Sequence, residues 1–101
     1  MAQTHIFKGT ARAQLTVNGA RHYVYHSTAV VIVNPDRSIR LDSGGWRTAT
    51  TRTAMNQASN QDELGFRVFQ RAGDWFVTWQ GRDLPFTDGM TLTHVPAEVA
   101  A

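Results

Sequence analysis

The chain has 101 residues, which is enough for one domain and too few for two. Hydrophobic residues make up 42% of it, and there is no cysteine, which excludes disulfides, thiol catalysis and cysteine-ligated metal. The longest unbroken apolar run, residues 29–33, is too short for a membrane span or a signal-peptide core. We therefore expect a cytoplasmic protein with no membrane contact, made of one domain over residues 1–95 and a flexible tail over 96–101.

The positive charge is carried almost wholly by arginine. Nine of the ten cationic residues are Arg, and the formal net charge is +2. A guanidinium group binds phosphate or carboxylate in two places and stacks on aromatic rings, which favours a surface for planar, anionic ligands. The alternative explanation for the excess of arginine over lysine is a genome rich in G and C. A net charge of +2 is too small for a protein that coats nucleic acid generally.

The first half of the chain predicts an antiparallel meander. Apolar and polar residues alternate, and Asn18-Gly19 is a dipeptide typical of tight hairpins. Asn34–Arg37 carries the signal of a type I turn. The predicted strands are residues 10–17, one long segment over 21–33 with a bulge near Ser27, and 38–42.

One helix is predicted, over Thr51–Glu63, with Thr50 or Thr51 as its N-cap and Gly65 as a left-handed terminator. A helical wheel separates two sides. The side expected to face the sheet holds Thr51, Ala54, Met55, Ala58 and Asp62, and the polar side holds Arg52, Thr53, Asn56, Gln57 and Asn60.

The second half returns to strands, over residues 66–71 and 75–80, with turns at 72–74 and 81–83. Alternation predicts that the core takes Trp75, Val77 and Trp79, together with Phe66, Phe69, Phe76 and Phe86. Arg67 and Arg71 share a strand face with Phe69, a pattern that also suits single-stranded nucleic acid. The predicted fold class is α+β: a small twisted antiparallel β-sheet of about five to seven strands with one α-helix packed on it.

The densest polar cluster lies between the last strand of the first half and the helix. Paired glycines let a ligand approach the backbone, and a helix N-terminus favours an anion. Neither a Walker loop nor the dinucleotide-binding fingerprint is matched. The cluster predicts a phosphate or nucleotide cradle made of Gly44, Gly45, Trp46, Arg47, Thr48, Thr50, Thr51 and Arg52. The alternative is a tight turn before a capped helix, with Trp46 in the core and the arginines in solvent.

Other chemistry has weaker support. His22 and His26 are spaced to share a strand face, but no third ligand lies nearby in the sequence, so hydrogen-bonding histidines are favoured over a metal site or a ribonuclease-like pair. No serine lies in a nucleophile-elbow context. We therefore expect no enzyme activity, no cofactor and no metal.

A long block of the sequence resembles a family of short proteins from bacteriophages, prophages and mobile elements, over about residues 28–92. The segments that carry the resemblance are Leu41–Thr51, Met55–Asn60, Leu64–Gln70, Trp75–Val77 and Leu84–Leu92. The resemblance brings no established activity and no catalytic residues.

The resemblance implies a phage accessory protein, and by analogy such proteins often block host defences. The leading hypothesis is sequestration, without chemistry, of a small phosphorylated (cyclic) nucleotide signal. In it Arg47 and Arg52 bind phosphates and Trp46 stacks on a base. We expect a homo-oligomer, because one small chain has little interior to enclose a ligand. The alternatives are an inhibitor or assembly partner that contacts a host protein, and a nucleic-acid-binding accessory protein.

Overall fold

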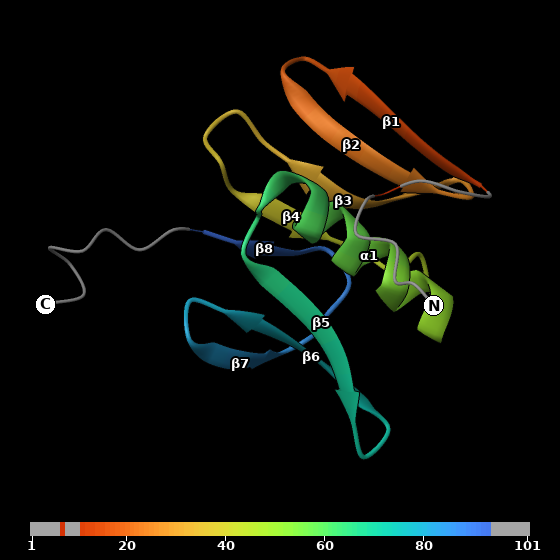
Figure 1. Ribbon diagram of the computed structural model, residues 1–101, viewed down its shortest axis with the longest axis vertical. Coiled ribbons are helices and arrows are strands. Elements are labelled where there is room, and N and C mark those ends of the chain that lie inside the picture. Colours follow the sequence, from red (N-terminus) through yellow and green to blue (C-terminus); the bar gives the residue numbers. More distant parts are fainter. Residues whose placement is uncertain (1–6, 8–10, 94–101) are drawn as a thin grey trace, which may run out of the picture.

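The computed structural model describes residue 7 and residues 11–93, so the predicted tail over 96–101 lies outside the described residues (Figure 1). This part of the chain folds into one helix and two antiparallel sheets, with the strand orders β1-β2-β3-β4-β8 and β5-β6-β7. The α+β class with one helix packed on antiparallel strands is confirmed, although the strands divide between two sheets. The elements are β1 (Arg12–Val17), β2 (Ala20–Tyr25), β3 (Thr28–Val33), β4 (Ile39–Leu41), α1 (Ala49–Asp62), β5 (Phe66–Arg71), β6 (Asp74–Trp79), β7 (Arg82–Pro85) and β8 (Met90–Leu92).

The predicted hairpin at Asn18-Gly19 is confirmed. Both residues have positive φ, 52° and 82°, as a two-residue turn between twisted antiparallel strands requires. The predicted long strand over 21–33 is wrong. The chain reverses at His26 and Ser27, where His26 takes a φ of 58°, and β2 and β3 pair with each other across a register shift at Tyr23/Val24. A histidine–serine turn lacks the glycine or proline that marks a turn in sequence.

Strand β4 joins two distant parts of the chain. The predicted turn at 34–37 is confirmed: Arg37 N–H donates to the Asn34 carbonyl at 2.8 Å, and the Asp36 carboxylate accepts from the Ser38 amide at 2.9 Å. On its other side β4 pairs with β8, which follows the second sheet in sequence. The chain therefore leaves the first sheet, builds the second, and returns to the first at its edge.

The helix starts and ends earlier in the chain than predicted. Its N-cap is Thr48, not Thr50 or Thr51, because the Thr48 hydroxyl accepts from the Thr51 amide at 3.3 Å. Its C-cap is Glu63 in the left-handed conformation, φ 53°, rather than Gly65. The division into two sides also needs correction, since Gln57 and Ser59 are buried.

Helix α1 fills the space between the sheets, packing against β2 and β3 on one side and β5 on the other (Figure 1). Two of its polar side chains bind the edge of β5. Asn56 Nδ2 donates to the Val68 carbonyl at 2.9 Å and its Oδ1 accepts from the Val68 amide at 2.8 Å. The Ser59 hydroxyl makes the same pair of bonds with Phe66, at 2.7 and 3.2 Å. The helix therefore takes the place of a fourth strand beside β5.

The second sheet is built from two further tight hairpins. Ala72-Gly73 and Gln80-Gly81 repeat the paired positive φ values of the first hairpin. The turn predicted at 81–83 is therefore displaced by one residue, and Arg82 belongs to β7. No helix in the described part of the chain is long and apolar enough to cross a membrane.

The core lies between the two sheets and around α1. The predicted burial of Trp75, Val77 and Trp79 is confirmed. Phe69 and Phe76, predicted in the core, are only partly buried, because they stack on each other on the opposite face of the second sheet, with ring centroids 5.7 Å apart. The buried apolar residues are Phe7, Tyr23, Val30, Val31, Ile39, Leu41, Ala54, Met55, Ala58, Phe66, Val68, Trp75, Val77, Trp79, Phe86 and Leu92.

Candidate functional site

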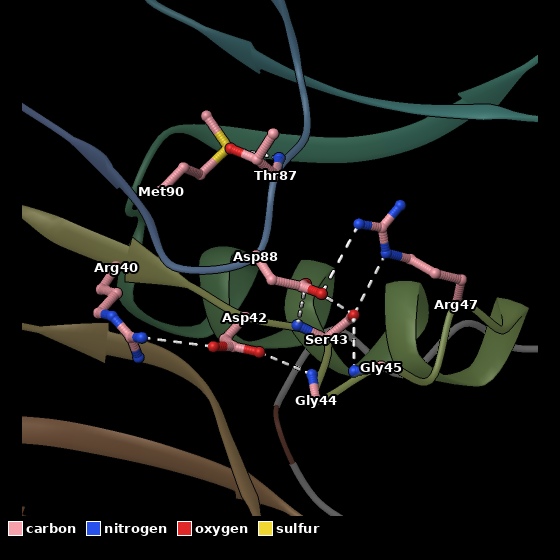
Figure 2. A network of polar contacts seen from close by, with 9 residues as sticks. All are labelled: Arg40, Asp42, Ser43, Gly44, Gly45, Arg47, Thr87, Asp88 and Met90. Atoms are coloured by element: carbon pink, nitrogen blue, oxygen red, sulfur yellow. Dashed lines mark hydrogen bonds and ion pairs between the residues drawn. The ribbon is translucent and has the colours of Figure 1, made fainter.

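The segment between β4 and α1 is held in shape by its own side chains and by the loop before β8 (Figure 2). Ser43 donates to Asp88 Oδ1 twice, from its amide at 2.8 Å and from its hydroxyl at 2.7 Å. The Gly44 amide donates to Asp42 Oδ1 at 2.7 Å, and the Gly45 amide donates to the Ser43 hydroxyl at 3.2 Å. The glycine amides that were predicted to reach a ligand are therefore engaged inside the loop.

Asp88 is the residue that joins the two loops. Partial burial raises the pKa of its carboxyl group, but the amide and hydroxyl of Ser43 and the charge of Arg47 outweigh this effect and lower the pKa below its ordinary value. The bonded form in the native protein is therefore the carboxylate. Its partner Ser43 lies 45 positions away in the chain, so no pattern within either segment indicates this contact.

The two arginines of the predicted cradle lie beside Trp75. Arg47 makes a 3.7 Å ion pair with Asp88, and its guanidinium carbon is 5.3 Å from the centroid of Trp75 and 5.0 Å from that of Phe86. Arg52 lies 5.5 Å from the Trp75 centroid, and its buried Nε has no hydrogen-bond partner. Arg47 also borders a hollow of about 330 Å³ with Trp75, Phe76 and Phe86.

Trp46 lies at a different hollow. Its side chain is 67% exposed, so it is not the core residue that the alternative interpretation required. The hollow has a volume of about 410 Å³, within the range of small-molecule sites. Its other lining residues come from the β2–β3 turn and the start of α1: Tyr25, His26, Ser27, Thr48, Thr50 and Thr51.

The lining of the Trp46 hollow combines aromatic rings with hydroxyl groups. The rings of Tyr25 and His26 are 4.4 Å apart, and the guanidinium of Arg12 lies 4.9 Å from the Tyr25 centroid. The hydroxyls of Thr48, Thr50 and Thr51 lie at the N-terminus of α1, where Thr48 contacts the other two at 3.1 and 3.0 Å. Among the described residues, no carboxylate lines this hollow.

The structure thus brings half of the predicted site residues to one hollow and places the rest elsewhere. Trp46, Thr48, Thr50 and Thr51 line the Trp46 hollow. Arg47 borders the other hollow, and Gly44 and Gly45 lie in the loop between β4 and α1. Sequence reasoning missed the contribution of the turn between β2 and β3, because it treated residues 21–33 as one strand. The positive φ of His26 has no sequence signal that would have revealed that turn.

The histidines do not form a metal centre with other ligands in the described residues. His22 lies within β2 and His26 in the following turn. No group of three histidine, aspartate or glutamate side chains in residues 11–93 is placed to hold a metal ion.

Comparison with known proteins identifies the family. The family model described as Kyanoviridae Gp96 protein matches residues 3–93. The chain belongs to this family of phage proteins. The match includes residues 3–27, to which the resemblance seen in the sequence did not extend. No curated protein and no solved structure matches the chain.

Proposed function

We propose that this phage protein binds a small phosphorylated nucleotide in the Trp46 hollow and sequesters it without chemistry, as a counter-defence protein in the host cell. The observation that carries the proposal is the Trp46 indole, 67% exposed beside a hollow whose lining also includes Tyr25, His26 and the start of α1. Both a flat apolar surface and a source of positive potential are therefore available to one ligand.

The residues that line the hollow suggest how a nucleotide lies in it. Its base stacks on the Trp46 indole, a contact worth about 1–3 kcal/mol in aromatic nucleic-acid sites. Its phosphate faces the hydroxyl of Thr50 at the start of α1, where the helix dipole contributes roughly 0.3–1 kcal/mol. Thr51 is only 1% exposed and its hydroxyl contacts that of Thr48, so it supports this site from beneath. Arg47 and Arg52 act only through their field in this arrangement, because neither lines the Trp46 hollow.

Tryptophan fluorescence tests the proposal directly. The other two tryptophans, Trp75 and Trp79, are 5% and 6% exposed, so acrylamide quenches Trp46 selectively. A bound nucleotide should protect Trp46 from acrylamide and should release heat in calorimetry. The panel consists of cyclic dinucleotides and cyclic ADP-ribose derivatives. Absence of both protection and heat with every compound would refute the proposal.

Two variants locate the site. Trp46→Ala should weaken binding at least tenfold, which corresponds to the loss of one stacking contact. Thr50→Val should weaken it less, through the loss of one hydroxyl. Thr53→Val is the matched control, because Thr53 is exposed on the same helix, bonds the Ala49 carbonyl and does not line the hollow. Equal effects of the two valine substitutions would place the ligand elsewhere.

The second candidate function is contact with a host protein through the outer face of the second sheet. There Arg71 lies 5.2 and 5.4 Å from the centroids of the stacked Phe69 and Phe76 rings and forms a 3.4 Å ion pair with Asp83. Its charge is offset by that carboxylate, which favours a protein surface over a phosphate backbone. A host protein retained by the tagged chain, lost with Phe76→Ser and unaffected by nucleotides, would support this function. A salt-sensitive gel shift would instead favour nucleic acid.

A further inference from the structure

Strand β1 forms one edge of the five-stranded sheet, and no strand in the described part of the chain pairs with its other side (Figure 1). In β1 and β2, Val17 faces Ala20 across a two-residue turn, and the His26 amide donates to the Ala11 carbonyl at 2.7 Å. Hydrogen-bonded pairs alternate along an antiparallel ladder, so residues 11, 13, 15 and 17 bond toward β2. The amides and carbonyls of Gln14 and Thr16 therefore point away from the sheet.

The other sheet edges in the described residues are protected, and β1 is not. Asn56 and Ser59 of α1 occupy the edge of β5. Strand β7 carries two charged residues and ends at Pro85, and β8 is only three residues long. Short strands, charges and proline are the usual ways in which an edge is kept from pairing. After Arg12, by contrast, β1 has five residues without charge or proline.

The exposed side chains of β1 are apolar on one face. Leu15 is 45% exposed and Val17 is 42% exposed, and Ala13 shares their face because side chains alternate along a strand. Together with Trp46, these two residues are the large hydrophobic side chains that the described part of the chain leaves exposed. The open backbone and the apolar face thus occur on the same strand.

We propose that β1 pairs antiparallel with β1 of a second copy of this chain, about a two-fold axis at Leu15. The outward amide and carbonyl of Gln14 then bond the carbonyl and amide of Thr16 of the partner subunit. The two-fold axis repeats this pair of bonds between Thr16 and the partner's Gln14. Leu15 faces Leu15 of the partner subunit in a close, non-hydrogen-bonded pair, and Ala13 faces the partner's Val17.

The sequence of β1 is self-complementary in this register. Arg12 lies opposite Asn18 of the partner subunit, so the two guanidinium groups are at opposite ends of the new ladder and no like charges meet. The register covers both exposed apolar side chains with apolar neighbours. A shift by one residue would set the open amides of one β1 against groups of the other that are already bonded to β2. The ladder geometry therefore favours this register over the two that are shifted by one residue.

Sedimentation equilibrium tests the dimer. The protein should show twice its monomer mass of 11.2 kDa and should dissociate on dilution. Leu15→Lys sets two ammonium groups opposite each other at the axis and should return the mass to that of the monomer. Thr91→Lys is the matched control, since it adds the same charge to an exposed position on β8, at the opposite edge of the sheet. A wild-type monomer at every concentration, or equal effects of both substitutions, would overturn the proposal.

Cross-linking tests the register independently of stability. The chain has no cysteine, so a single introduced thiol reports on its own symmetry mate. Leu15→Cys should form a covalent dimer on mild oxidation, because Cα atoms in a non-hydrogen-bonded pair lie about 4.5 Å apart, within disulfide range. Val17→Cys, equally exposed, should not, because the two copies are offset by four residues, roughly 13 Å. Equal cross-linking of both variants, or none of Leu15→Cys, would contradict the register.

Discussion

Asn56 forms two hydrogen bonds that join α1 to the second sheet. Asn56→Ala should therefore destabilise the protein strongly. The substitution leaves both the amide and the carbonyl of Val68, a residue only 2% exposed, without their partner. Losing two hydrogen bonds and leaving buried polar groups unpaired costs about 2–4 kcal/mol. Alanine returns about 0.5 kcal/mol through its higher helix propensity. The expected net loss is therefore about 2–3 kcal/mol.

Urea unfolding followed by circular dichroism measures this loss, and thermal unfolding should show a fall in Tm of roughly 10–20 °C. Asn60→Ala is the matched control, because Asn60 is an exposed asparagine on the same helix, one turn later, and makes none of the hydrogen bonds seen for Asn56. That variant should be unchanged or slightly more stable. If the two variants had the same free energy of unfolding, α1 would not be substituting for a strand beside β5.

Three further predictions concern the loop that supports the Trp46 hollow. The pKa of Asp88 is lowered in the folded state, so its carboxylate stabilises the protein fully at pH values above the ordinary pKa near 3.8. This stabilisation is lost as the pH falls through the lower pKa of the folded state. Asp88→Asn should remove this part of the acid dependence, as measured by urea titrations at several pH values. Gly44→Ala should cost more stability than Gly45→Ala, since both have positive φ but only at Gly44 does a Cβ overlap the side chain of Thr28; similar melting temperatures would contradict this. Thr48→Ala should lower the free energy of unfolding by about 1 kcal/mol through loss of the N-cap, and a loss of helix signal at low urea would accompany it.

Local signals in the sequence were sufficient where a structure is decided by neighbouring residues. Asn18-Gly19 forms its hairpin because both residues tolerate positive φ, and the alternation of Trp75, Val77 and Trp79 places them in the core. The same reasoning failed at His26, which takes the left-handed conformation in a turn that contains neither glycine nor proline. There the pairing of β2 with β3 imposes the turn on the sequence.

The sequence analysis named only part of the residues that line the Trp46 hollow, since Tyr25, His26 and Ser27 were missed, and it did not predict their arrangement. Trp46 and the threonines at the start of α1 were correctly placed next to each other, since they are neighbours in the chain. The direction taken by Arg47 depended on Asp88 and Trp75, which come from loops and strands far away in sequence. Patterns within a segment contain no information about such partners.

The sequence by itself determined the turns at Asn18-Gly19 and residues 34–37, helix α1 and the alternation that divides each strand into two faces, because these depend on the φ/ψ preferences and side-chain spacing of adjacent residues. Only the tertiary structure decided that β8 returns to β4, that the polar side of α1 binds the edge of β5, and that Trp46 and Arg47 face different hollows. Each of these depends on packing between segments distant in the chain, where the lowest free energy belongs to the whole fold rather than to any one stretch of it.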